Sequence, residues 1–224
     1  MHHIYFCESQ IQEEVDVIGT ELSEREVNAV PGETAARFMV IEGLSAVGKS
    51  TVAPLVADYL GAELVQTSLP SFDDVRVHVD RSRAVMARLH FWLMCNYAVS
   101  EVVRAHLAQG RDVVLESYFH RTVATHVAMG ATNLPDIDWD RAVAPDLTVL
   151  LTVEEAERRR RLADREANGR LSYWSRLEES NVAATRETYK SFGLLALDTT
   201  GLGVVDVAQR LAAAFVDPAR LRRV

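Results

Sequence analysis

The chain has 224 residues, of which 48% are hydrophobic and 25% are charged, as is typical of one globular domain with a full core. Its net charge of −8 argues against a general nucleic-acid binder, so we expect no nucleic acid among its partners. No apolar stretch approaches the about 20 residues of a membrane span, which excludes that class of membrane contact.

The cysteines and the N-terminal residues indicate the cellular compartment in which the protein is expected. Cys7 and Cys95 are isolated and have no metal-binding spacing, which is typical of reduced cytosolic proteins. The first seven residues lack the layout of a signal peptide, and we expect a cytoplasmic protein. Residues 1–36 are mostly acidic and polar, and we interpret them as an N-terminal extension without a readable function. One domain at 37–217 and a C-terminal tail at 218–224 follow.

The first predicted strand, 37–42, leads directly into Gly-Leu-Ser-Ala-Val-Gly-Lys-Ser at 43–50. This octapeptide fits the phosphate-binding loop G-x-x-x-x-G-K-[ST], whose glycines let backbone N–H groups turn inward around phosphate oxygens. Apolar residues at helical spacing predict a helix over 48–60. Strand, loop and helix in this order favour a phosphate site over an ordinary glycine turn. The residues expected to bind the nucleotide are Gly43, Ser45, Ala46, Val47, Gly48, Lys49, Ser50 and Thr51.

Three polar residues at this loop have distinct expected roles. Lys49 can reach the β- and γ-phosphates, and the Ser50 hydroxyl can ligate Mg²⁺. Glu42 directly precedes the loop. It could touch the metal or the phosphate acceptor, or it could equally be a structural hydrogen-bond acceptor, and both interpretations stay open.

After a second predicted strand at 62–67, basic residues precede a long helix predicted over 82–109. Arg76 is the candidate from this segment for holding the acceptor. Tyr97, on the long helix, is a candidate for stacking on a flat acceptor. For Phe91 and Trp92 we favour core positions, because aromatic residues at helical spacing are more often core.

A third predicted strand, 111–116, ends in the carboxylate of Glu116. A carboxylate at such a strand end can hold Mg²⁺ or accept a proton from an attacking hydroxyl, and we favour these roles over a solvated strand end. Tyr118 and Arg121 lie at the start of the next predicted helix, 119–129, and are candidates for binding the acceptor. For Arg121 a surface position is equally open.

A fourth predicted strand, 146–153, precedes an arginine-rich helix predicted over 154–164. Most of its arginines have a carboxylate four residues away, as in ordinary surface ion pairs. Arg165 has none at that spacing, and it shares a helix face with Arg161. Asn168-Gly169 then breaks the helix. The pattern favours a mobile lid at about 163–172 that brings both arginines to a transferring phosphoryl group.

The remaining predicted elements are a helix at 173–191, a strand at 194–198 and a helix at 204–216. Strands and helices thus alternate from residue 37 onward, which predicts an α/β fold with a five-stranded parallel sheet flanked by helices. The ligand site then lies at the carboxyl ends of the strands.

Over roughly residues 37–216 the chain resembles the thymidylate kinase and deoxynucleoside kinase group of P-loop kinases. The resemblance implies a P-loop NTPase fold of the nucleoside and nucleotide kinase type, with Arg161 and Arg165 where the group has its lid arginines. The other segments that carry the resemblance are Phe38–Thr51 with its Glu-Gly pair, Pro145–Leu151, the Arg-x-x-Tyr at Arg186 and Tyr189, and Leu197-Asp198.

Three positions depart from this group near the acceptor. Ser68-Leu69-Pro70 stands where thymidylate kinases usually carry Arg-Glu-Pro, and Met94-Cys95 replaces an Asp-Arg pair. Glu116-Ser117 replaces Asp-Arg, or Glu-Arg in nucleoside kinases. Charge-assisted contacts to a phosphate are strong, so their loss argues against dTMP itself as the acceptor.

The leading hypothesis is an ATP-dependent phosphotransferase that moves the γ-phosphate of Mg-ATP to a nucleoside or nucleoside monophosphate. Lys49, Glu116, Arg161 and Arg165 would be catalytic, with Ser50 and Glu116 as metal ligands. ATP and Mg²⁺ are the expected cofactors, and a small-molecule phosphate acceptor is the expected partner, with a homodimer left open. One alternative is a P-loop kinase acting on a sugar, antibiotic or specialised metabolite. A second is a nucleotide-binding regulator without transfer activity.

Overall fold

The structure is a computed structural model that describes residues 35–170 and 172–223. The expectations for the extension at 1–36 therefore lie almost wholly outside the described residues, as does position 171 of the predicted lid. None of the helices within the described ranges combines the length and the apolar character that a bilayer crossing needs.

A mostly parallel sheet organises the domain, with strands in the order β2-β3-β1-β4-β5-β6. All five side chains of β1 (Phe38–Glu42) are buried, as expected for a strand with neighbours on both edges. Every pairing among the first five strands is parallel, which confirms the predicted core of the sheet. The other four strands of that core are β2 (Glu63–Val65), β3 (Val113–Glu116), β4 (Leu147–Thr152) and β5 (Leu195–Asp198).

A sixth strand corrects the prediction of five. β6 (Arg222–Arg223) pairs antiparallel with β5, in the segment that we interpreted as a tail. It follows a short turn, η2 (Pro218–Arg220). Two exposed arginines carry no apolar alternation, so the sequence gives no periodic signal for this strand.

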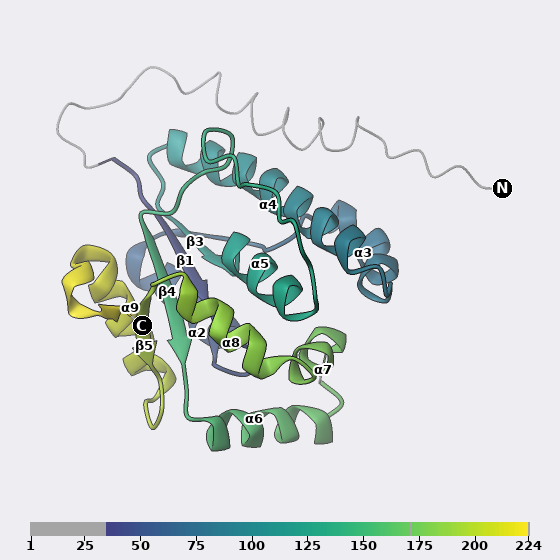
Figure 1. The fold of residues 1–224 in the computed structure, drawn as a ribbon. Coiled ribbons are helices and arrows are strands. Elements are labelled where there is room, and N and C mark those ends of the chain that lie inside the picture. The colour runs from purple at the N-terminus through teal and green to yellow at the C-terminus, as the bar shows by residue number, and fades with distance from the viewer. Residues whose placement is uncertain (1–34, 171, 224) are drawn as a thin grey trace.

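Side chains alternate across β1 and build a core on each face of the sheet. Met39 and Ile41 pack in one cluster with α2 (Lys49–Leu60) and α9 (Val204–Val216). Phe38 and Val40 pack in the other with α4 (Val85–Ala108). Figure 1 shows these helices on opposite sides of the sheet, which confirms the layered α/β arrangement.

One observed helix was not predicted, and one predicted helix is divided in two. A separate helix, α3 (Asp73–Asp80), follows the short turn η1 (Pro70–Phe72) and comes before α4. The helix predicted over 173–191 is instead two helices, α7 (Tyr173–Glu179) and α8 (Val182–Ser191). Asn181 lies at the break, where its side-chain amide donates to the Leu177 carbonyl at 3.2 Å. Such a bond competes with continued helix formation.

The carboxyl ends of the strands carry the site. The loop between β1 and α2 emerges there, and so does the start of α5 (Phe119–Ala128), which follows β3. Figure 1 shows α6 (Glu155–Ala167) and α7 beyond this end of the sheet. The fold thus surrounds the loop at 43–50 with segments that are far apart in the sequence.

Candidate active site

The loop at 43–50 turns on two glycines with positive φ. Gly43 has φ +138°, and a Cβ there would lie 2.6 Å from the Leu151 carbonyl oxygen, so only glycine allows this approach to β4. Gly48 has φ +111° and directly precedes α2. The beginning of a helix beside inward-turned loop amides is an arrangement suited to phosphate oxygens.

Lys49, the first residue of α2, is buried against its own loop. Its ammonium donates to the carbonyl oxygens of Gly43 and Leu44 at 2.9 and 3.1 Å. Burial lowers the pKa of Lys49 to about 8, and repulsion from Arg121 adds to this shift. A positive charge in such a low-dielectric place is better neutralised by a bound anion than by water.

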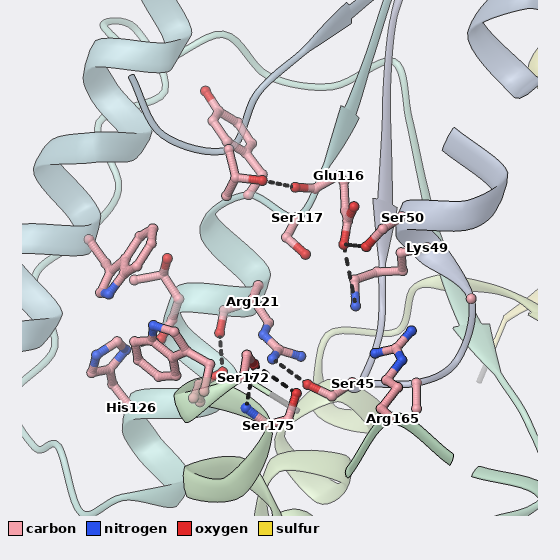
Figure 2. Close-up of a pocket in the computed structure, with 18 residues that line it drawn as sticks. Ser45, Lys49, Ser50, Glu116, Ser117, Arg121, His126, Arg165, Ser172 and Ser175 are labelled. Atoms are coloured by element: carbon pink, nitrogen blue, oxygen red, sulfur yellow. Dashed lines mark hydrogen bonds and ion pairs between the residues drawn. The ribbon is translucent and has the colours of Figure 1, made fainter. Parts of the chain in front are cut away.

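Ser50 and Glu116 form a pair of oxygen donors beside Lys49. The Ser50 hydroxyl donates to Glu116 Oε1 at 2.8 Å, and Lys49 Nζ lies 4.0 Å from the same oxygen (Figure 2). Hydroxyl and carboxylate oxygens are the donor types that Mg²⁺ prefers, so the pair fits this ion. Within the described residues, His, Cys, Asp and Glu form no group of three or more that could hold a metal. Further ligands would therefore come from phosphates and water.

Glu42 does not line the cavity, and its contacts favour the structural one of its two open interpretations. Its Oε1 accepts from the backbone N–H groups of Tyr118 and Arg121 at 2.8 and 3.3 Å, and its Oε2 accepts from the Tyr189 hydroxyl at 3.0 Å. Burial raises its pKa to about 7, against the lowering effect of these bonds. With both oxygens engaged and no exposure, Glu42 has a structural position.

Glu178, which sequence reasoning missed, links α7 to the loop. Its Oε2 accepts from the Ser45 hydroxyl at 2.6 Å and from the Arg121 guanidinium at 2.6 Å. Burial acts to raise the pKa of Glu178, but the charge of Arg121 and the bonds from Ser45 outweigh it and leave a net lowering. Arg121 is thus not a surface residue, and its charge is paired with Glu178. In the sequence, the only sign of Glu178 is that it belongs to an acidic pair at 178–179.

The two predicted lid arginines lie on α6 over the loop. Arg161 donates to Glu157 at 2.8 Å and to the carbonyl oxygens of Ala46 and Val47 at 3.4 and 3.3 Å. Arg165 lines the cavity and makes no ion pair within the described part of the chain. The structure therefore brings both arginines to the loop. Of the two, Arg161 is paired with a carboxylate, and Arg165 is not paired with one among the described residues.

Two residues predicted to bind the acceptor are not brought to the cavity. Arg76, on α3, pairs with Asp73 at 3.0 Å and with Asp80 at 3.7 Å. The Tyr97 ring packs against Phe119, and its hydroxyl accepts from the backbone N–H of Asp138 at 2.9 Å. The partners of Arg76 lie three and four residues away on its own helix, a spacing that is visible in the sequence. The partner of Tyr97 is 41 positions away, which sequence spacing alone does not reveal.

The cavity itself, about 250 Å³ in volume, extends from the loop to an aromatic far end. Phe91 is in the core as predicted, but its neighbour Trp92 faces the cavity. Tyr118 contributes to the wall, with its hydroxyl directed to Ser100. Hydroxyl and aromatic residues that the sequence did not single out complete the far end, namely Thr122, Thr125, His126, Ser172, Trp174 and Ser175.

Comparison with known proteins agrees with this geometry. No protein-family model matches the chain. A curated relative from Thermococcus gammatolerans, named "Probable thymidylate kinase", is 28% identical in an alignment of 152 residues that covers 57% of this chain and 71% of the relative. The solved structure of thymidylate kinase from Candida albicans superposes with a TM-score of 0.63 and 17% identity, covering 85% of this chain and 98% of that one.

The sheet, the phosphate-binding loop and these similarities give the chain the fold of the P-loop kinases. Among such kinases it is thymidylate kinase-like, which confirms the resemblance drawn from the sequence. The similarities support an activity of the nucleotide kinase type.

Proposed function

We propose that the chain moves the γ-phosphoryl group of Mg-ATP to the 5′-hydroxyl of a nucleoside or to a phosphate oxygen of a nucleoside monophosphate. The observation that carries this proposal is the contact of Lys49, Ser50 and Glu116 at one end of a cavity whose other end is open to an acceptor. The loop of residues 43–51 would hold the nucleotide phosphates through its backbone N–H groups.

Mg²⁺ would be held by Ser50 and Glu116, and when bound it neutralises charge on the nucleotide phosphates. Lys49 and Arg165 would supply positive charge to the phosphoryl oxygens, and Arg161 would hold the loop to α6. Charges that the surrounding protein holds in place need no reorganisation during reaction, so positioning and electrostatics would carry the catalysis.

The proposed transfer is a direct displacement. The acceptor oxygen forms a bond to the γ-phosphorus, and the bond from that phosphorus to the β–γ bridging oxygen breaks. ADP leaves with the electron pair of that bond, and the proton of the acceptor hydroxyl passes to water or to the Glu116 carboxylate.

An ADP-release assay over deoxyribonucleosides and their 5′-monophosphates tests this proposal. Lys49→Ala should lower turnover by about 10²–10³-fold, because one charge on the developing phosphoryl is lost. Lys190→Ala is the matched control, since Lys190 pairs with Glu187 at the surface. Absence of acceptor-dependent ADP release across the whole panel contradicts the proposal.

A second candidate is a kinase for a small molecule that is not a nucleotide, such as a sugar or an antibiotic. It is favoured by Ser117, which lines the cavity with a hydroxyl where thymidylate kinases carry an arginine. Adding aminoglycosides, sugars and nucleoside-like antibiotics to the assay separates the two candidates. The regulator without transfer activity is not proposed further, because the relatives indicate an enzyme.

A further inference from the structure

The cavity has two ends with different chemistry. Figure 2 shows Lys49, Ser50, Glu116 and Arg165 toward one end and His126 toward the other, with Arg121 between them. If the proposed function holds, the first end takes the donor phosphates. The second end then meets the acceptor, and its charges decide which acceptors bind.

Positive charge is scarce at the acceptor end. Among the described residues, three cationic side chains line the cavity, namely Lys49, Arg121 and Arg165. Lys49 and Arg165 lie toward the donor end. Arg121 is therefore the one cation of this set that could meet a phosphate on the acceptor.

Arg121 is already paired with a carboxylate of the protein, that of Glu178. Its guanidinium lies 2.6 Å from Glu178 Oε2, and the Glu178 side chain has no exposure to solvent. A second nitrogen of the same guanidinium donates to the Gly43 carbonyl at 2.8 Å. Glu178 is held in turn by the backbone N–H and the hydroxyl of Ser45. The carboxylate thus already neutralises Arg121, the cation of this set that an acceptor phosphate would need.

The aromatic far end adds no free charge. Trp174 makes edge-on contacts with Trp92 and His126, at ring separations of 5.7 and 5.8 Å. The His126 Nδ1–H donates to the Thr122 carbonyl at 2.7 Å, and burial lowers its pKa to about 4, so the ring is neutral. Arg88 lies behind this wall, where it donates to the Ser82 carbonyl at 2.9 Å.

We infer that the acceptor of this kinase is unphosphorylated and uncharged, and that Glu178 sets this preference by neutralising Arg121. A phosphate beside the buried Glu178 carboxylate would meet like charge in a low-dielectric cavity without a cation of its own. A neutral acceptor with a flat ring can instead pack against Trp92 and Trp174. The inference rests on the proposed function and selects the nucleoside over the nucleoside monophosphate.

Binding of matched pairs tests it directly. Wild-type protein with Mg²⁺ and a non-hydrolysable ATP analogue is titrated calorimetrically with each of four deoxyribonucleosides and with its 5′-monophosphate. We expect the nucleoside of at least one pair to bind about 10- to 100-fold more tightly than its monophosphate. The phosphate of the monophosphate would lack a charge-assisted contact to a free cation, because Glu178 already neutralises Arg121. Tighter binding of monophosphates overturns the inference, and so does the absence of binding by every nucleoside.

A Glu178→Gln variant tests the role of Glu178 itself. Glutamine keeps the shape and an oxygen for Ser45 but frees the charge of Arg121, so the preference should shift toward monophosphates by about tenfold or more. Glu179→Gln is the matched control, because Glu179 pairs with Arg158 at 2.5 Å and does not line the cavity. An unchanged preference in folded Glu178→Gln protein contradicts the role of Glu178, and the wild-type titration decides the inference if this variant does not fold.

The inference and the proposed function can fail separately. Turnover of monophosphates at rates above those of nucleosides overturns the inference and leaves an ATP-dependent kinase. Failure of every acceptor to stimulate ADP release removes the proposed function, whatever the titrations give.

Discussion

Glu178 accepts two hydrogen bonds from Ser45, one from the hydroxyl at 2.6 Å and one from the backbone N–H at 3.0 Å. The two residues are 133 positions apart, and their contact joins α7 to the phosphate-binding loop. Because Glu178 also pairs with Arg121, one buried carboxylate holds three segments of the site together.

The buried pair makes Glu178 important for stability as well as for binding. Glu178→Gln leaves the Arg121 charge without its partner in a buried place, and we expect a loss of about 3 kcal/mol in the free energy of unfolding. Urea denaturation measures it. Glu187→Gln, at an exposed surface pair, should cost less than about 1 kcal/mol. Equal costs for the two variants contradict this account of the pair.

Gly43 is expected to be intolerant of any side chain. In Gly43→Ala the new Cβ would press on the Leu151 carbonyl, so we expect a loss of about 2–4 kcal/mol in stability and of nucleotide binding. Gly61→Ala is the control, since Gly61 also has positive φ but no atom within 4 Å of the position that a Cβ would take. It should cost about 1 kcal/mol. Urea denaturation and titration with an ATP analogue measure both effects.

Glu116 is predicted to act at the metal or at the acceptor hydroxyl, and kinetics separate the two roles. Glu116→Gln should lower kcat by about 10²-fold in either case. A metal ligand also predicts that the Mg²⁺ concentration for half-maximal activity rises, whereas a proton acceptor predicts that it stays constant. Glu63→Gln, at a partly exposed pair with Arg111, is the control. Unchanged kcat in Glu116→Gln excludes both roles.

Arg165 and Arg160 lie on the same helix, but we expect their replacement to have different effects on kcat. Arg165 lines the cavity, so Arg165→Ala should reduce kcat by about 10²-fold with little effect on stability. Arg160 pairs with Glu157 and Asp164 at an exposed position, so Arg160→Ala should change kcat by less than about twofold. Single-turnover rates of the two variants measure the difference, and equal rates would remove Arg165 from the proposed transfer step.

His126 predicts a pH dependence of stability. In the unfolded chain its pKa is near 6.5, but in the fold it is about 4, so between these values the unfolded state binds more protons. Stability from neutral His126 is therefore present above pH 6.5 and is lost as the pH falls toward 4. Between about pH 7.5 and about pH 6 this loss is about 0.8 kcal/mol.

Comparison with His126→Phe isolates that contribution, because the other titrating groups are common to both proteins. Urea denaturation at the two pH values should show a smaller loss of stability in the variant than in the wild type. His90→Gln is the control, since His90 is exposed on α4. Identical losses in wild type and His126→Phe contradict the assignment.

Local patterns predicted the parallel core of the sheet and the loop at 43–50. Apolar runs bounded by turns identify buried strands, and a glycine loop between strand and helix identifies a phosphate site. The break between α7 and α8 was missed because it depends on one side-chain bond from Asn181 that does not alter the helical pattern. The strand β6 was missed because two residues carry no periodicity.

The amino-acid sequence by itself determined where the phosphate donor is expected to bind, because that site uses backbone groups of one continuous segment. The tertiary structure decided the surroundings of the acceptor, because those side chains come from α4, α5 and α7. Only the fold could place Glu178 against Arg121 and Ser45, remove Glu42 from the cavity and turn Tyr97 away from it. Such distant pairings depend on packing between elements, which no local spacing records.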